Sequence, residues 1–374
     1  YMFSDCKKLT AIDVSKFNTD RVTNMNNIFS GVSINRDKLD LSSFNTSRVT
    51  DMNSMFDRAK VATIDLSSFD TSNVTDMMNM FQLSTATEIK GLTRFNTSKV
   101  IYMTRMFYGS SVVDLDLSSF DTSNVIDMSY MFWQSKAKTI DVSSFDTSKV
   151  SSFSSMFDTI DLDYLNINNF NLQSADNLTT LFANSKIKKL DISSLDTSNI
   201  KYMISMFYRS KIDDLDLSKF DTSNVVDMTS MFADSDIKNL NVSNFNTSKL
   251  IRASSMFSGV TMDTLDLTSF DTTNLRKYSS MFAGANIKKL DFSTIYINYG
   301  DKKNTYDFSS MFQNYGNKVT NPEIYLNNLS KPYSYYITSI FSNFNSDLKI
   351  YTNSSAKSWL QSLSTIPDAN FVIV

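Results

Sequence analysis

The sequence predicts an α/β repeat solenoid of about thirteen 25-residue turns, and three observations predict it. A Met-Phe-type pair recurs along the chain, a second apolar landmark recurs in phase with it, and the residues between them change from a period of two to a helical period. From Phe107 to Phe282 the pair recurs at a constant spacing of 25 residues. The pairs end at Phe3, Phe29, Phe56, Phe81, Phe107, Phe132, Phe157, Phe182, Phe207, Phe232, Phe257, Phe282, Phe312 and Phe341. The second landmark occupies Phe17, Phe44, Phe69, Phe95, Phe120, Phe145, Phe170, Leu195, Phe220, Phe245, Phe270 and Ile295.

Each turn is expected to combine one short parallel strand with one short α or 3₁₀ turn. Leu115 and Leu117 alternate with polar residues, which is typical of a strand with one buried face. An apolar stripe at i, i+3, i+6 and i+7 then predicts one helical turn. It consists of Val125, Met128, Met131 and Phe132. Such a unit buries its apolar edge only against neighbouring turns, so we interpret the many Met and Phe residues as core rather than cofactor contacts.

The regularity of the repeat divides the chain into three segments. Residues 1–295 are predicted to form the regular 25-residue repeat solenoid, and residues 296–346 irregular, longer repeats. Residues 347–374 are expected to form a C-terminal cap, because they change to helical spacing over 354–363 and end in an apolar strand. The opening Tyr1-Met2-Phe3-Ser4 falls inside the repeated motif, so we expect a piece of a longer protein whose targeting and anchoring segments lie outside it.

The composition argues against several classes of function. A net charge of −3 lacks the basic surplus of a nucleic-acid-binding protein. The chain has no histidine, one cysteine and only 7 glycines, which disfavours a histidine general base, a disulfide framework, a thiolate zinc site and phosphate-binding loops. No apolar run approaches the roughly 18 residues that span a membrane. We therefore expect no enzymatic activity, no catalytic residues, no cofactor and no metal site.

Two columns of acidic and amide residues follow the repeat. The first is an outward strand position, interrupted at Gly91, Asn166 and Asn241, and consists of Asp13, Asp40, Asp65, Asp116, Asp141, Asp191, Asp216, Asp266 and Asp291. It could hold divalent cations, but one carboxylate per turn supplies few of the oxygens that calcium needs, so we favour hydrogen bonds to neighbouring amides and hydroxyls. The second column mixes Asp and Asn freely, as turn-forming residues do. It runs through Asn18, Asn45, Asp70, Asn96, Asp121, Asp146, Asn171, Asp196, Asp221, Asn246 and Asp271.

Large residues at outward positions are the candidates for a ligand-binding surface. Most turns carry small polar residues there, whereas two neighbouring turns carry Tyr102, Arg105, Tyr108, Tyr130 and Trp133. Tyr102 and Arg105 are three residues apart on one expected helical turn, and Tyr130 and Trp133 repeat that offset, so stacking should bring all five onto one flank. Tyr, Trp and Arg are enriched at binding hot spots, and aromatic faces also suit sugar stacking.

Two further groups are weaker candidates. One comprises Tyr202 and Tyr208, with Arg209 beside them. The other is the longer segment 296–306, which is expected to bulge outward and carries three tyrosines. These are Tyr296, Tyr299 and Tyr306.

The motif resembles a known family of repeats. Ile187-Lys-Lys-Leu190-Asp-Ile192 reads as the L-x-x-L-x-L strand signature of leucine-rich repeats. The fuller string Leu-Asp-Leu-Ser-Ser-Phe-Asp-Thr-Ser-Asn-Val-x-x-Met-x-x-Met-Phe resembles bacterial BspA-like leucine-rich-repeat surface proteins, and most closely the 25-residue repeat of mycoplasma lipoproteins. The resemblance is close over 1–295 and loose over 296–346. It implies a leucine-rich-repeat-like solenoid on a secreted or cell-surface protein, with roles in adhesion to host proteins, co-aggregation and immune recognition.

The main functional hypothesis is a binding module of an extracellular or cell-surface adhesin. Its partner would be a host protein, a matrix component or another cell, with a glycan as a further possibility, and neither nucleic acid nor direct membrane insertion is expected. The alternative is a passive spacer or surface coat that presents another domain; a carbohydrate-active enzyme is the third hypothesis, disfavoured because the acidic residues are periodic and no pair stands out. We expect a monomer, with edge-to-edge stacking of copies as the alternative.

Overall fold

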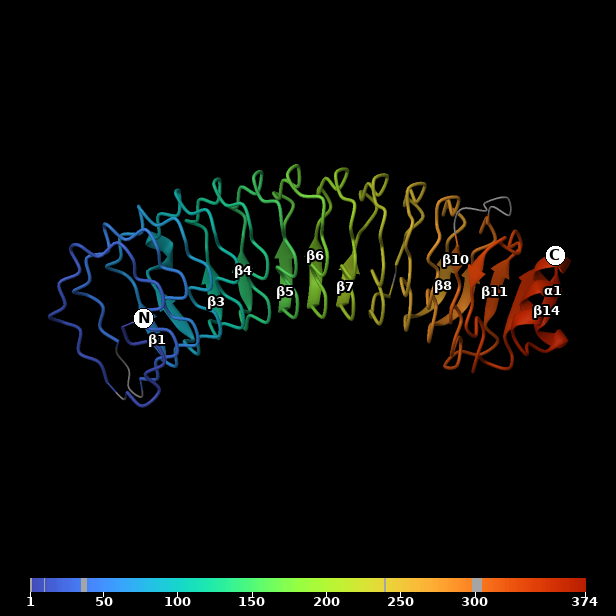
Figure 1. Ribbon diagram of the computed structural model, residues 1–374, viewed down its shortest axis with the longest axis horizontal. Coiled ribbons are helices and arrows are strands. Elements are labelled where there is room, and N and C mark those ends of the chain that lie inside the picture. Colours follow the sequence, from blue (N-terminus) through green and yellow to red (C-terminus); the bar gives the residue numbers. More distant parts are fainter. Residues whose placement is uncertain (1, 10, 35–38, 239, 298–304) are drawn as a thin grey trace. The chain divides into compact units, whose positions relative to one another are not determined.

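The computed structural model describes residues 2–9, 11–34, 39–238, 240–297 and 305–374. The chain divides into two compact units. Unit 1 comprises the chain up to Asp176 together with Leu181–Leu195, and unit 2 comprises Asn177–Thr180 and Asp196–Val374. In each unit successive turns of the coil lay parallel strands side by side (Figure 1). The predicted repeat solenoid is confirmed, with about twelve turns among the described residues, where about thirteen were expected.

Unit 1 contains six short strands and one 3₁₀ turn among its described residues, and the strands pair in parallel as β1 with β2, β3 with β4 and β5 with β6. In β1 to β4 one buried residue lies between two more exposed ones, as the period of two predicted. In β5 and β6 two exposed residues in succession interrupt this alternation. The elements are β1 (Thr63–Asp65), β2 (Glu88–Lys90), η1 (Leu92–Arg94), β3 (Asp114–Asp116), β4 (Thr139–Asp141), β5 (Asp161–Asn166) and β6 (Lys186–Asp191).

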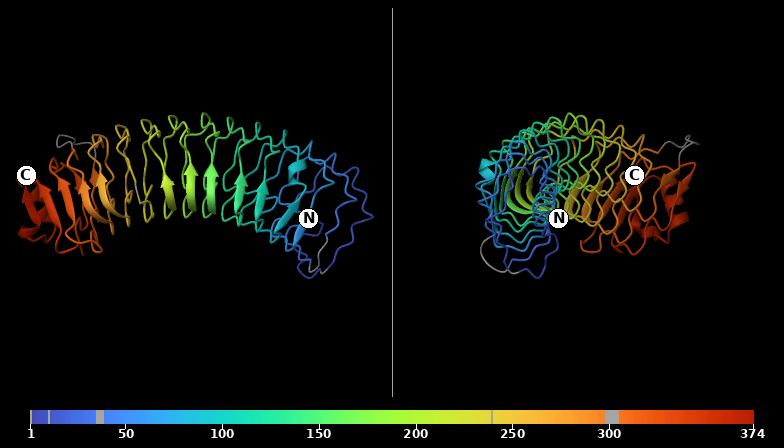
Figure 2. Two further views of the ribbon diagram at one scale, coloured as in Figure 1. Left: turned by 180° about the vertical axis from the view of Figure 1, so that it is seen from behind. Right: turned by 60° about the vertical axis from the view of Figure 1, so that its left-hand side comes forward.

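Unit 2 continues the same design and ends in the segment expected to be a cap. Its main parallel sheet has the order β14-β13-β11-β9-β8, while β10 pairs with β12. Figure 2 shows the strands near the C-terminus, in orange and red, side by side. The elements are β7 (Lys211–Leu215), β8 (Thr261–Asp266), β9 (Asn286–Asp291), β10 (Tyr306–Asp307), β11 (Glu323–Leu326), β12 (Tyr335–Tyr336), β13 (Lys349–Thr352), α1 (Ser354–Leu363), η2 (Asp368–Asn370) and β14 (Phe371–Ile373). Helix α1 covers 354–363, as its spacing predicted, and Trp359 packs edge-on against Phe308. No helix in the described ranges is long and apolar enough to cross a lipid bilayer.

The core repeats with the sequence. Leu115, Leu117, Val125, Met128, Met131 and Phe132 are all at most 1% exposed. The phenylalanines of the Met-Phe pairs stack ring on ring, with centroids 5.5–5.9 Å apart from Phe3 to Phe182 in unit 1. A corresponding stack runs from Phe207 to Phe341 in unit 2. The interpretation of Met and Phe as core residues is therefore confirmed.

The expected helical turn at each Met-Phe pair is wrong. Between Met128 and Ser135 the chain instead makes consecutive tight turns, with Tyr130 and Gln134 at positive φ of 60° and 56°. The amide of Met131 bonds the carbonyl of Met128 at 3.2 Å across Tyr130, which is the pattern of a type II turn. The intervening amides bond the next turn of the coil: Tyr130 N donates to Ser154 O at 2.8 Å and Phe132 N to Met156 O at 3.0 Å. Bonding between turns replaces the internal bonding of a helix.

Glycine 91 marks an inserted residue, and here the expected register is wrong. The spacing of the repeat predicted Gly91 in the aspartate column, but β1 and β2 pair Asp65 with Lys90. Gly91 follows the strand at φ 88° and leads into η1. A Cβ at this position would lie 2.7 Å from the carbonyl carbon of Leu66 and the amide nitrogen of Ser67. Only glycine fits both the backbone conformation and the space.

Candidate binding surface

Four of the predicted site residues meet in unit 1 and form what we call the aromatic cluster: Arg105, Tyr108, Tyr130 and Trp133. The rings of Tyr108 and Trp133 stack with centroids 4.7 Å apart and planes 12° apart. Tyr130 lies 5.3 Å from Trp133 at an angle of 46°. The Cζ of Arg105 sits 4.8 Å from the centroid of the Tyr130 ring. All four are partly exposed, so the cluster is a surface feature held together by its own contacts.

Equivalent positions on successive turns bring these side chains together. Arg105 and Tyr130 each occupy the left-handed position before the Met-Phe pair, with φ of 57° and 60°. Tyr108 and Trp133 each follow the phenylalanine of the pair. The sequence analysis placed these residues on one flank because of helical spacing. In the structure, tight turns bring them together instead. Hydrogen bonds to the next turn of the coil hold the backbone there, for example from Arg105 N to Ser129 O at 3.1 Å.

Tyr102 is not part of this cluster. It is 41% exposed and lies in a separate column, where its backbone forms bridges to Asp76 and Asp127. Within the described ranges no ring contact joins Tyr102 to the four cluster residues. The expectation that all five residues gather is therefore wrong for Tyr102, because it precedes the tight turns instead of sharing a helical face with Arg105.

The second group, in unit 2, is not assembled in the same way. The Cζ of Arg209 lies 4.9 Å from the ring centroid of Tyr208, and its Nε lies 3.5 Å from Oδ2 of Asp234. Tyr202 occupies the bridge column, next to Asn177 and Asp227. Among the described side chains no ring contact links Tyr202 with Tyr208.

Comparison with known protein families matches most of the chain to one family. The profile of a family described as a Mycoplasma protein of unknown function, DUF285, matches residues 1–89, 82–193 and 176–296 in tandem. This chain belongs to the DUF285 family. The expected mycoplasma-type repeat is thereby confirmed. No curated protein and no solved structure matches the chain.

The acidic columns of the DUF285 repeat close turns. Asp116 Oδ1 accepts hydrogen bonds from the amide and hydroxyl of Ser118 at 3.1 and 2.6 Å. In the second column, Asp121 Oδ1 accepts the amide of Ser123 at 3.0 Å. The interpretation of both columns as hydrogen-bond acceptors is confirmed. These bonds favour the ionised form, and the Ser118 hydroxyl and then its amide hold the pKa of Asp116 below its usual value.

Acid is expected to destabilise this repeat. Twelve described aspartates have a lowered pKa, so their ionised forms stabilise the fold above the ordinary value of 3.8, and that contribution is lost as the pH falls through the lowered values. Two buried aspartates, Asp57 and Asp158, have a raised pKa instead, so their contribution to stability changes with pH in the opposite direction. Thermal unfolding should therefore show a Tm that is flat above about pH 5 and falls below about pH 4. Asp116→Asn should keep its turn and reduce the acid sensitivity, and an unchanged Tm down to about pH 2 would contradict the expectation.

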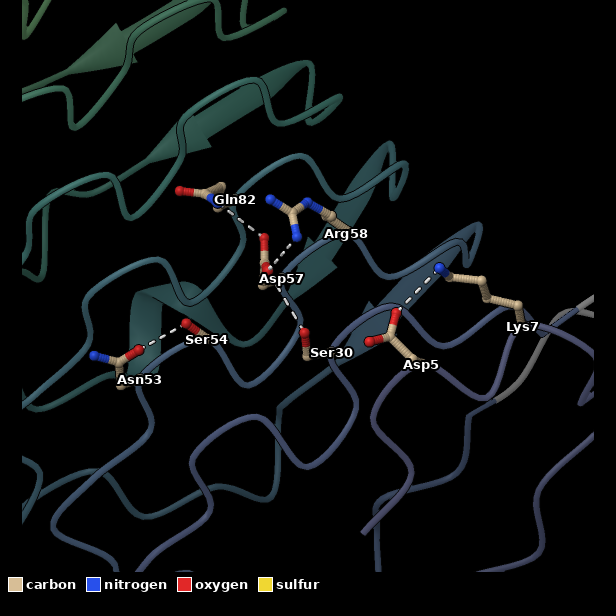
Figure 3. Close-up of polar contacts among 8 residues, drawn as sticks. All are labelled: Asp5, Lys7, Ser30, Asn53, Ser54, Asp57, Arg58 and Gln82. Carbon is tan, nitrogen blue, oxygen red and sulfur yellow. Dashed lines mark hydrogen bonds and ion pairs between the residues drawn. The ribbon is translucent and has the colours of Figure 1, made fainter. Parts of the chain in front are cut away.

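Two buried aspartates lie in the same column as Tyr108 and Trp133. Asp57 and Asp158 follow the phenylalanine of their pairs, as Tyr108 and Trp133 do. Asp57 accepts Gln82 Nε2 at 3.1 Å and lies 3.7 Å from Arg58 Nη1 (Figure 3). Burial raises the pKa of Asp57 and of Asp158. No sequence pattern indicates this burial, since these positions look like other outward polar sites.

Of the two described tyrosines of segment 296–306, one is exposed and one is buried. Tyr306 is fully buried at the start of β10, with Arg276 Cζ 4.9 Å from its ring centroid. Tyr296 is 51% exposed, and its amide bonds the hydroxyl of Thr272 at 2.7 Å. Tyr299 lies outside the described residues. The alternation of the following strand turns Tyr306 inward, which corrects the prediction for that residue.

The strand side of unit 1 has a hollow of about 470 Å³ that includes Asp40, Asp65 and Lys90. Asp40 and Asp65 each accept the amide of the serine two residues on, at 3.0 Å. The Ser67 hydroxyl and amide lower the pKa of Asp65, whereas a general acid needs a raised one. Both carboxylates thus close turns, and the hydrogen bonds of Asp65 favour its ionised form.

Proposed function

We propose that this chain is the binding module of a secreted or cell-surface adhesin and that the aromatic cluster is its contact site. The cluster is the observation that supports this, because its four large side chains replace the small polar residues of other turns without serving the core. Tyr, Trp and Arg carry much of the binding energy at protein interfaces. Side chains already held by mutual stacking lose little conformational freedom on binding.

The resemblance to BspA-like leucine-rich-repeat surface proteins supports the same proposal. The partner would then be a host protein, a matrix component or the surface of another cell, bound by a monomer without catalysis. A passive spacer is the competing role, since a regular coil can hold another domain away from a surface. The cluster favours binding, because a spacer gains nothing from stacked aromatic residues on its outside.

Arg105→Ser combined with Trp133→Ala should abolish partner binding. Serine and alanine are the residues that other turns place at these positions, for example Ser155 and Ala183, so the coil should fold normally. Loss of two hot-spot side chains corresponds to an affinity decrease of about 100-fold or more. The measurement is capture of host plasma and epithelial surface proteins on the immobilised chain, identified by mass spectrometry and followed by direct binding of the captured protein.

The matched control is Arg94→Ala with Tyr164→Ala, which removes an arginine and a half-exposed tyrosine of unit 1 outside the cluster. It should leave capture unchanged, while both double variants keep their Tm within about 4 °C of the parent. Capture that survives in the cluster variant would remove the cluster from the binding site. Failure to capture any saturable partner would favour the spacer.

A further inference from the structure

We propose that the aromatic cluster recognises an acidic peptide segment of a partner protein, with a ligand carboxylate on Arg105 and apolar contacts on the rings of Tyr108 and Trp133. This inference rests on the proposed binding function and specifies the chemistry of the partner.

The orientation of the rings is the first argument. Tyr108 and Trp133 occupy equivalent positions on successive turns and stack nearly parallel, so each ring covers a face of the other. Tyr130 leans on Trp133, and Arg105 covers Tyr130. Sugars stack on open aromatic faces, and here stacking covers one face of Tyr108 and one face of Trp133. Both residues remain partly exposed, which leaves part of each ring for contacts with a ligand.

The donors of the cluster are the second argument. Arg105 has five N–H donors and no acceptor, the indole of Trp133 has one donor, and each tyrosine has a hydroxyl. Such a surface is rich in donors and fits a ligand rich in acceptors. A guanidinium and a carboxylate also match in geometry, because they can form two parallel hydrogen bonds.

The charge of Arg105 is the third argument. Arg58, Arg209 and Arg252 each have a carboxylate oxygen within 3.7 Å. Arg105 has no such ion pair among the described residues, and its guanidinium is held over an aromatic ring instead. Its position is therefore fixed while its charge remains available to a ligand.

Two acidic residues on the turns of Trp133 and its neighbour, Asp127 and Asp158, accept hydrogen bonds from other groups. Asp127 Oδ1 accepts the amide of Ser129 at 2.8 Å. Asp158, in the turn after Trp133, accepts hydrogen bonds from the hydroxyl of Thr159 at 2.7 Å and from Asn184 Nδ2 at 3.0 Å.

A peptide is a better match for this surface than an isolated anion. It combines a carboxylate with side chains that can contact the rings on two adjacent turns, which an isolated anion cannot do.

The test uses the full chain labelled with 5-fluorotryptophan and observed by ¹⁹F NMR. The protein has only two tryptophans. Trp133 lies in the cluster, and Trp359 is buried in unit 2, where it serves as an internal reference. The probes are acetyl-(Tyr-Glu)₃-amide, its Gln and Lys counterparts, and a methyl sialoside as a carboxylate carried by a sugar.

We expect the Glu peptide to shift the Trp133 resonance saturably while the Trp359 resonance stays in place. The Gln and Lys peptides should bind at least about tenfold more weakly, as expected for loss of one charge-assisted contact. Arg105→Gln should weaken the Glu peptide by a similar factor, and added salt should weaken it further. Arg94→Gln is the control and should leave the titration unchanged.

Three results would overturn the inference: equal shifts with the Glu and Gln peptides, no shift with the Glu peptide, or a shift with the sialoside alone. If these occur while Arg105→Ser with Trp133→Ala still abolishes partner capture, the binding function stands and only the ligand chemistry is wrong. If that variant captures normally, the cluster itself is not the binding site.

Discussion

Replacing Phe132 with alanine is expected to lower the free energy of unfolding by about 3–5 kcal/mol. Phe132 is fully buried and stacks between Phe107 at 5.9 Å and Phe157 at 5.5 Å. Its removal leaves a cavity between two turns and interrupts the ring stack of unit 1. In a solenoid each turn is stabilised mainly by its neighbours, so the gap should also weaken the coupling between turns. Urea denaturation followed by circular dichroism measures the loss.

Ile126→Ala is the matched control, because it removes apolar atoms from the same turn at a side chain that is 38% exposed. It should cost less than about 1 kcal/mol. Phe132→Leu keeps most of the volume and should fall between the two, near 1.5 kcal/mol. If Phe132→Ala and Ile126→Ala destabilise equally, the ring stack is not a principal source of stability.

Gly91→Ala is expected to lower the free energy of unfolding by about 2–4 kcal/mol. The left-handed backbone costs a residue with a Cβ about 1–2 kcal/mol. The new Cβ would also lie 2.7 Å from backbone atoms of Leu66 and Ser67, which cannot move without disturbing β1. The measurement is again the free energy of unfolding from urea titration.

Gly284→Ala separates these two causes. Gly284 has a φ of 67°, but the nearest atom to its added Cβ is 4.0 Å away. Gly284→Ala should therefore lower the free energy of unfolding only by the cost of the left-handed backbone, about 1–2 kcal/mol. Equal effects at Gly91 and Gly284 would show that the close approach to Leu66 is relieved by movement of the chain.

Much of the architecture could be predicted from the sequence because a repeat amplifies a weak signal. A single Leu115-Asp-Leu117 alternation is ambiguous, but its recurrence with the Met-Phe pair predicts strand, spacing and core together. The second acidic column was also predictable, since free exchange of Asp and Asn indicates a turn-closing acceptor. The grouping of Tyr108, Tyr130, Trp133 and Arg105 followed from counting positions along the repeat.

The conformation of the turns could not be predicted by the same reasoning. The spacing of Met128, Met131 and Phe132 fits a helical turn and a pair of type II turns equally well. The positive φ at Tyr130 arises because the amides around it bond Ser154 and Met156 in the next turn, and those partners exist only in the stacked coil. Propensity opposes a left-handed tyrosine, and bonding between turns outweighs it.

The sequence by itself therefore determined the repeat, its strands, its core and its hydrogen-bonding columns, because the pattern that indicates each of them recurs in nearly every turn. The tertiary structure alone decided the contacts between turns. It placed Gly91 outside the aspartate column, left Tyr102 apart from the aromatic cluster and buried Tyr306. Each of these depends on the register of neighbouring turns, which is set by packing and backbone bonding across about 25 residues of chain.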